Sequence, residues 1–186
     1  MPNRTIEAQL RQRGLQVLGP CEHLSQRTEL RAESALLRDF TPEETELLGA
    51  HMLRIGAQPG QLLIAEGDAS DWMMILLRGT VDIGKRKVGA QADSQEPGDT
   101  TRLGVVRAGA VLGEMSMLDG EPRYASCWAL SEVEAAVMTR AAVGRLIGAH
   151  PAVGAKLLVK LTQLLAQRLR NTSNTLVKVL RKNAAA

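Results

Sequence analysis

Residues 53–137 consist of short apolar runs separated by glycine, and this pattern limits the possible folds more than any other feature of the chain. Such runs between glycine turns are typical of β-strands, because glycine adopts positive φ angles at little steric cost. Many short strands with turns between them predict a barrel or roll. The predicted strands are residues 62–65, 72–77, 81–83, 103–106, 125–130 and 133–138.

A helix start precedes these strands. Thr41 fits the N-cap, Pro42 the first turn, and Glu44 stands three residues on, as in a capping box. We expect this helix to reach about Met52. Residues 1–40 are polar with few apolar positions, and we predict that they form a helical extension.

The C-terminal part of the chain changes to a helical pattern. Residues 139–150 predict a short helix, and Pro151 opens a longer one. An apolar stripe at three- and four-residue steps follows it. The first half of the stripe suits packing against the roll. The second half extends beyond a roll of this size and predicts a homodimer through pairing with the same helix of a second subunit. The stripe consists of Leu158, Leu161, Leu165, Leu169, Thr172, Leu176 and Val179.

Together these patterns predict an α+β fold, an antiparallel β-roll or jelly-roll-like small barrel with N-terminal helices and a long C-terminal helix. The predicted parts are a helical extension at 1–40, the roll domain at 41–150, and a long C-terminal helix at 151–186. Residues 85–102 predict a long polar hairpin loop that starts with a solvated basic run.

Charge is distributed unevenly along the chain. Residues 1–134 hold 14 basic and 20 acidic residues, whereas residues 135–186 hold nine basic and no acidic residues. Two interpretations remain open: a solvated helix face, or a surface for an acidic partner, an anionic membrane or nucleic acid. Aromatic residues make up 2%, so bases would have no stacking platform. Only 16 residues follow Arg170, too few for a helix-turn-helix domain, and we expect no direct DNA binding.

Several other site classes find no support in the sequence. Cys21 and Cys127 are far apart and require no disulfide, which predicts a reducing cytoplasm. The three histidines are scattered, so we predict neither a metal site nor a cofactor. No apolar run is long enough for a membrane span, and the polar N-terminus does not resemble a secretory signal.

One segment carries the chemistry for an anionic ligand with a sugar. Residues 112–127 read LGEMSMLDGEPRYASC. The carboxylate of Glu114 can accept hydrogen bonds from sugar hydroxyls, and nine residues later Arg123 can bind a phosphate with two parallel N–H donors. A helix start between them can offer free backbone N–H groups. The spacing allows both side chains to face one pocket.

This segment resembles the phosphate-binding cassette of cyclic nucleotide-binding domains. The matching residues are Gly113 to Leu118, three loop residues, and then Pro122-Arg123-Tyr124-Ala125-Ser126. A second block at residues 60–81 is similar to the first strands and glycine turns of that family. The two blocks are collinear, and the resemblance covers roughly residues 40–170.

The resemblance implies a role for each matching residue. Glu114 would bind the ribose 2′-hydroxyl and Arg123 the cyclic phosphate, while backbone N–H groups complete the anion site. The implied ligand-binding residues are Gly113, Glu114, Met115, Ser116, Arg123, Tyr124, Ala125 and Ser126. In this family the helix after the roll usually covers the purine. The candidates for that base lid are Arg168, Leu169, Thr172 and Ser173, although Thr172 and Ser173 equally suit polar positions at a helix crossing.

The predicted function is a non-catalytic cyclic nucleotide sensor that couples ligand binding to movement of its C-terminal helix, with a protein effector as a further partner. Tyr124 stands where the family often has a small or hydroxylated residue, which leaves the base open; cAMP is favoured over cGMP on frequency alone. No nucleophile–base pair lies in the cassette, so we expect no enzyme activity. The alternative is a degenerate domain that keeps the fold and acts as a dimerisation or protein-interaction module.

Overall fold

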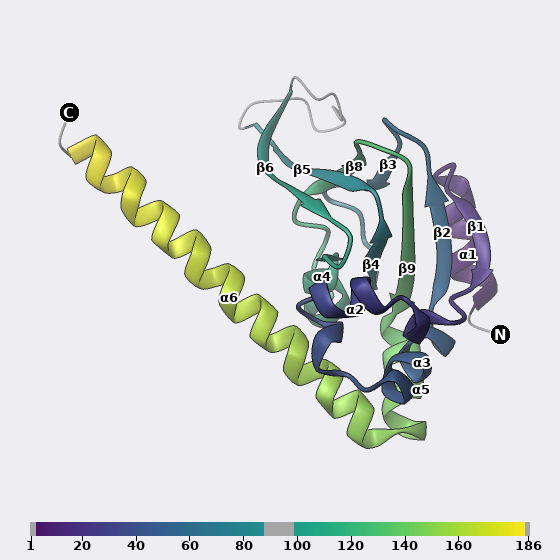
Figure 1. Ribbon diagram of the computed structural model, residues 1–186. Helices are drawn as coiled ribbons and strands as arrows, with labels where there is room; N and C mark the ends of the chain where they lie inside the picture. The colour runs from purple at the N-terminus through teal and green to yellow at the C-terminus, as the bar shows by residue number, and fades with distance from the viewer. Residues whose placement is uncertain (1–2, 88–98, 185–186) are drawn as a thin grey trace.

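The computed structural model describes residues 3–87 and 99–184. A β-roll of two antiparallel sheets forms the body, helices cover its lower end and one side, and the long helix α6 (Pro151–Ala184) projects away from it (Figure 1). The predicted α+β class, with an antiparallel roll, flanking helices and a long C-terminal helix, is confirmed.

The roll consists of a five-stranded and a four-stranded sheet, in which every pair of neighbouring strands is antiparallel. The first sheet has the order β1 (Gln16–Pro20), β2 (Leu53–Ala57), β9 (Val133–Thr139), β4 (Trp72–Arg78) and β7 (Val111–Leu112). The second has the order β3 (Leu62–Ile64), β8 (Ser126–Ala129), β5 (Thr80–Arg86) and β6 (Thr100–Arg107).

The six predicted strands are present, and three further strands were not predicted. The prediction that residues 1–40 are helical is wrong for residues 16–20, which form β1 and pair with β2 at the edge of the first sheet. Both β5 and β6 extend into the predicted loop at 85–102, and residues 88–98 of that loop lie outside the described residues.

Seven further helical elements surround the roll in the described chain. They are α1 (Asn3–Gln12), the 3₁₀ turns η1 (Leu24–Gln26) and η2 (Leu37–Asp39), α2 (Thr28–Glu33), α3 (Pro42–Ala50), α4 (Glu114–Asp119) and α5 (Arg140–Ala149). The capping box predicted for α3 is present, since Thr41 Oγ1 accepts from the Glu44 amide at 3.2 Å and Glu44 Oε2 accepts from the Thr41 amide at 2.9 Å. This helix ends at Ala50, two residues before the expected end.

Strand β4 separates two apolar cores. Its residues Met73, Ile75 and Leu77 pack against the helices, while the alternating Trp72, Met74 and Leu76 fill the roll interior. A strand that is buried on both faces reads as one continuous apolar run, as residues 72–77 do.

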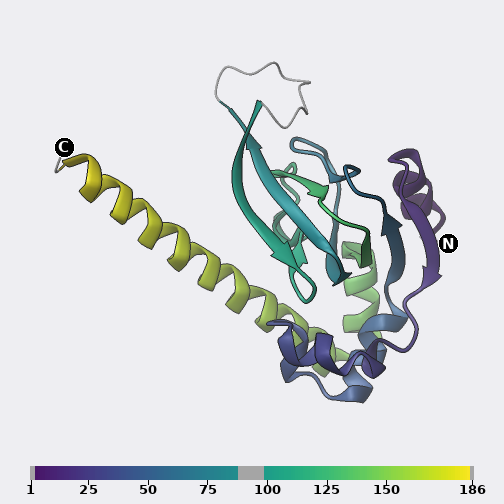
Figure 2. The ribbon, with the colours of Figure 1, turned by 45° about the horizontal axis from the view of Figure 1, so that its top comes forward.

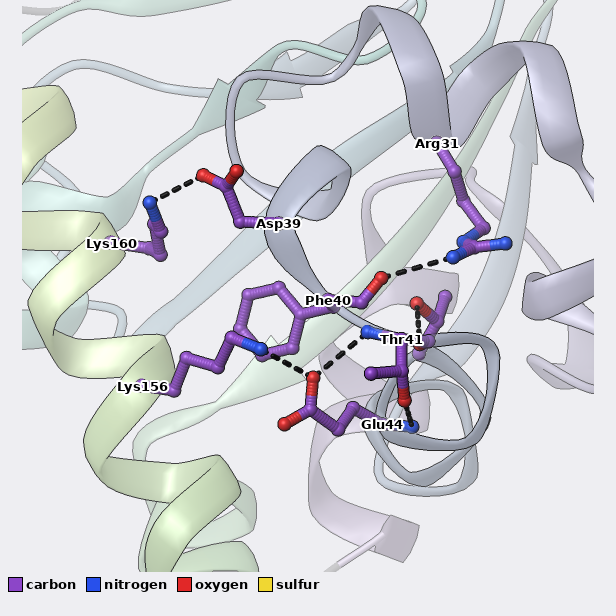
Figure 3. A network of polar contacts seen from close by, with 8 residues as sticks. Arg31, Asp39, Phe40, Thr41, Glu44, Lys156 and Lys160 are labelled. Carbon is purple, nitrogen blue, oxygen red and sulfur yellow. Dashed lines mark hydrogen bonds and ion pairs between the residues drawn. The ribbon is translucent and has the colours of Figure 1, made fainter.

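The base of α6 is fixed to η2 and α3 by a polar network (Figure 3). Lys156 Nζ donates to Glu44 Oε2 at 2.5 Å and lies 4.9 Å from the centre of the Phe40 ring. One turn further along, Lys160 forms an ion pair with Asp39. Exposed ion pairs are individually weak. Here they add to the buried contacts of Val153, Leu157 and Leu161, which anchor the same turns of the helix in the helical core.

The distal half of α6 has no covering layer in either view (Figures 1 and 2). Its apolar side chains are 44–66% exposed; they are Leu169, Leu176, Val177, Val179 and Leu180. Within residues 3–87 and 99–184, no helix has the length and apolar character needed to cross a membrane.

Candidate functional site

A cavity of about 540 Å³ lies between the second sheet, α4 and α6. Its apolar wall comes mainly from β3, β5, β6 and the residues around β7 and β8, and its polar groups come from α4, residues 123–125 and α6. The cavity is lined by Ile64, Ile83, Leu103, Gly104, Val106, Leu112, Gly113, Glu114, Met115, Ser116, Arg123, Tyr124, Ala125, Cys127, Arg168, Asn171 and Thr172.

Glu114 places a buried carboxylate at this cavity. It is the first residue of α4 and is 2% exposed. Its Oε1 accepts a hydrogen bond from Arg168 of α6, and the same guanidinium donates to the Val111 carbonyl at 2.6 Å. The two partners differ in burial, because the Arg168 side chain is 44% exposed and the Glu114 side chain only 2%. One side of the carboxylate is therefore held by α6, 54 residues along the chain.

Arg123 places a buried guanidinium at the same cavity, with 3% of the residue exposed. Nε donates to Ser70 Oγ at 2.7 Å, Nη1 to the Gly113 carbonyl at 2.7 Å and Nη2 to the Trp72 carbonyl at 2.5 Å. The Trp72 ring lies 4.3 Å from Cζ. These bonds use three of the five guanidinium N–H donors, so two can serve a ligand. Burial lowers the pKa of Arg123 to about 10, which leaves it positively charged at neutral pH.

Gly113 makes the close approach of these groups possible. Its φ of +75° is in the left-handed region, which disfavours side chains. A Cβ atom there would lie 2.5 Å from Arg123 Nη1 and 3.1 Å from the Trp72 carbonyl oxygen. Because Arg123 bonds to Gly113 and Glu114 is the next residue, the cation and the anion of the site converge on one stretch of backbone.

The backbone of Arg123 is fixed by the turn that follows β3. The Arg123 amide donates to the Asp68 carbonyl at 2.9 Å, and its carbonyl accepts from the Gly67 amide at 2.9 Å. Asp68 in turn forms an ion pair with Arg13, just after α1. The N-terminal segment thus supports the arginine loop, a connection that the sequence pattern did not predict.

Helix α4 is held at its other end by Arg140, the first residue of α5. Its Nε donates to the Met117 carbonyl at 2.7 Å and its Nη2 to the Ser116 carbonyl at 2.9 Å. A positive charge at a helix C-terminus is favourable, because the last carbonyls lack partners within the helix. Arg140 thereby fixes the helix whose first residue is Glu114.

Most of the residues singled out from the sequence line the cavity. Of the eight implied ligand-binding residues, only Ser126 does not; it is buried, and its Oγ accepts from the Glu66 amide at 2.9 Å. Of the four lid candidates, Arg168 and Thr172 line the cavity and Leu169 and Ser173 do not. Asn171, which was not predicted, lines it as well, as the three- and four-residue spacing of one helix face requires.

Neither cysteine is poised for chemistry. Cys127 lines the cavity but is 4% exposed, and burial raises the pKa of its thiol to about 12. Burial likewise raises the pKa of Cys21 to about 11. Among the described residues, no three His, Cys, Asp or Glu side chains are grouped so as to hold a metal ion.

Comparison with known proteins gives one consistent family. Residues 55–150 match the profile described as cyclic nucleotide-binding domain. The CRP-like cAMP-activated global transcriptional regulator of Mycobacterium tuberculosis is 28% identical over 152 residues, 82% of this chain and 62% of the regulator. A cAMP-dependent protein kinase regulatory subunit of Aspergillus niger is 31% identical over 116 residues, 62% of this chain and 26% of the subunit. The chain thus spans less than two thirds of each of these relatives.

A solved structure is similar over more of the chain. The crystal structure of a cyclic nucleotide-binding domain from Methylobacillus flagellatus is 32% identical, covers 88% of both chains and has a TM-score of 0.74.

Proposed function

This chain belongs to the cyclic nucleotide-binding domain family, and we propose that it is a non-catalytic sensor that binds cAMP in preference to cGMP and couples binding to the position of α6. The observation that carries the proposal is the convergence of Glu114 and Arg123 on one cavity of about 540 Å³. A cyclic phosphodiester has one negative charge and two free oxygens, which suits the two remaining donors of a buried guanidinium. A ribose hydroxyl suits the carboxylate.

The preference for cAMP is supported by the names of the relatives. Both the regulator from M. tuberculosis and the kinase subunit from A. niger are described as cAMP-dependent or cAMP-activated. The apolar wall of the cavity, with Ile83, Leu103 and Val106, offers a surface for a purine ring of either kind. Thr172 and Asn171 line the same cavity from α6 and are the candidates for contacting the base.

Coupling to α6 is supported by the contact between Arg168 and Glu114. A ribose hydroxyl that bonds to this carboxylate competes with Arg168 for its oxygens or shares them. The interaction that holds α6 at the site then differs between the free and the nucleotide-bound protein. A ligand shifts a helix between two positions only if it binds them with different affinities, and this competition would supply the difference. The exposed apolar side chains of distal α6 suit a homodimer through this helix, and its basic residues suit an acidic effector.

A second candidate function rests on the same two residues. Both charged groups already have partners within the protein, and this arrangement would also stabilise a domain that no longer binds nucleotide and serves in dimerisation or protein interaction. Calorimetric titration with cAMP and with cGMP separates the two. We expect heat and a one-to-one stoichiometry per chain from cAMP, with weaker binding of cGMP. No heat from either nucleotide would favour the interaction module.

A further inference from the structure

Lys85 is tied to the arginine loop, although the sequence predicts a solvated basic run at this point. Its Nζ donates to the Tyr124 carbonyl at 2.7 Å, lies 3.4 Å from Glu66 Oε1 and stands 3.9 Å from the centre of the Tyr124 ring. The side chain is 37% exposed, whereas that of Glu66 is 17% exposed. The ammonium therefore contacts the protein at three points: a backbone carbonyl, a carboxylate and the face of a ring.

The Tyr124 carbonyl that Lys85 binds belongs to the loop that lines the cavity. Tyr124 lies between Arg123 and Ala125, and all three residues line the cavity. A trans peptide is planar and its C=O and N–H groups point in opposite directions. Holding the Tyr124 carbonyl therefore sets the direction of the Ala125 N–H, just as the Gly67 amide, by holding the Arg123 carbonyl, sets the direction of the Tyr124 N–H.

Glu66 completes the connection between the loop and β5. Its Oε2 accepts from the Arg86 amide at 2.8 Å, and its own amide donates to Ser126 Oγ at 2.9 Å. The carboxylate thus links β5 to the turn after β3 and holds the Lys85 ammonium beside the loop. The Tyr124 residue is 56% exposed, and a cation over the face of its ring is a favourable contact.

From this geometry we infer that Lys85 is a positioning residue of the nucleotide site: it fixes the peptide plane between Tyr124 and Ala125, while the Tyr124 ring shelters the ammonium and serves no base recognition. This inference rests on the proposed function. It gives the exposed tyrosine ring a role at a position where the family resemblance leads us to expect a small or hydroxylated residue, because the ring lies against Lys85.

The test compares variants by calorimetric titration with cAMP and cGMP. Lys85→Met keeps most of the aliphatic stem and removes the charge and the donors. We expect its Kd for both nucleotides to rise roughly tenfold, about the loss of one hydrogen bond from a misdirected Ala125 N–H to the nucleotide, with an unchanged cAMP-to-cGMP ratio. Lys178→Met makes the same chemical change on exposed α6 and should leave both Kd values as in the parent. Lys85→Arg, which can still donate to the carbonyl, should recover most of the affinity.

Tyr124→Ala separates the carbonyl from the ring, because the carbonyl remains in that variant. We expect a smaller loss than in Lys85→Met, roughly twofold to fourfold and equal for the two nucleotides. A changed cAMP-to-cGMP ratio in this variant would overturn the role given to the ring.

The possible outcomes distinguish a failure of this inference from a failure of the proposed function. If the parent binds nucleotide and Lys85→Met binds as tightly as Lys178→Met, Lys85 has no positioning role and the sensor function stands. If the parent binds neither nucleotide, the function itself fails. If Lys85→Met folds poorly, the affinities of Tyr124→Ala and Lys85→Arg relative to the parent still test the role of Lys85. An unchanged affinity in Tyr124→Ala together with a tenfold loss in Lys85→Arg would contradict the inference.

Discussion

Replacing Arg123 by lysine tests the site most directly, because the guanidinium forms three internal hydrogen bonds and is also the proposed phosphate-binding group. Lysine keeps the positive charge and loses the planar fork. It can keep one of the three hydrogen bonds to Ser70, Gly113 and Trp72, so about two charge-assisted bonds are lost. At about 1.5–3 kcal/mol each, reduced by what the ammonium recovers, the free energy of unfolding should fall by about 2–4 kcal/mol. For a chain of this size the ligand-free Tm should fall by roughly 5–15 °C.

The same substitution should remove most of the stabilisation by nucleotide. A ligand at 100 times its Kd stabilises the parent by about 2.7 kcal/mol, which is roughly 5–10 °C in Tm. Loss of bidentate phosphate binding should weaken affinity by about a hundredfold. At the same nucleotide concentration the variant would then gain only about 0.4 kcal/mol, or roughly 1 °C.

Thermal melts with and without cAMP measure both effects. Leu48→Ala is the matched control: it creates a cavity in the helical core, costs about 2–5 kcal/mol, and belongs to a core cluster whose buried members do not line the site. It should melt earlier than the parent yet keep the full shift on adding nucleotide. The reasoning is refuted if Arg123→Lys retains the shift seen in Leu48→Ala.

Three further predictions concern groups around the site and the base of α6. Arg168→Met leaves the buried Glu114 carboxylate without its ion-pair partner; allowing for the exposure of the arginine, urea unfolding should show a loss of about 1–2 kcal/mol, and no loss would argue against the contact. Gly113→Ala places a methyl group 2.5 Å from the arginine guanidinium at a φ of +75°, so nucleotide affinity and Tm should fall together, and an unaffected affinity in calorimetry would contradict the close approach. The hydrogen bond from Lys156 lowers the pKa of Glu44 below its ordinary 4.5, so this contact stabilises the protein above about pH 4.5 and the stabilisation is lost as the pH falls through the folded-state pKa. The difference in unfolding free energy between the parent and Lys156→Met should therefore be present at pH 7 and shrink on acidification; a difference that grows towards low pH would reverse the sign.

The roll was predictable because its strands are apolar runs with glycine between them, and that pattern is local. Strand β1 was not predictable in the same way: Gln16–Pro20 is short, contains Gly19 and Pro20, and becomes a strand by pairing with β2, 33 residues later at the Pro20–Leu53 pair. Such an edge strand is specified by its partner more than by its own residues.

The site residues differ in the same way, between those indicated by a local sequence pattern and those brought in by the fold. The position of Glu114 and Arg123 at one cavity was predictable, because residue type, spacing and family resemblance agreed. Ser70 and Arg140 were not, because their contribution is a side-chain bond to Arg123 in one case and to backbone carbonyls 23 and 24 residues away in the other. Which residues of α6 line the cavity was not predictable either, since the sequence gives the periodicity of a helix but not the angle at which it meets the roll.

The geometry of α6 has a mechanical consequence. The helix is clamped as far as Lys160, contacts the site at Arg168 and ends at Ala184. At 1.5 Å per residue, the contact lies about 12 Å from the clamp and the end about 36 Å from it. A rigid rod that pivots at the clamp would therefore magnify any displacement of the helix axis at Arg168 about threefold at its far end.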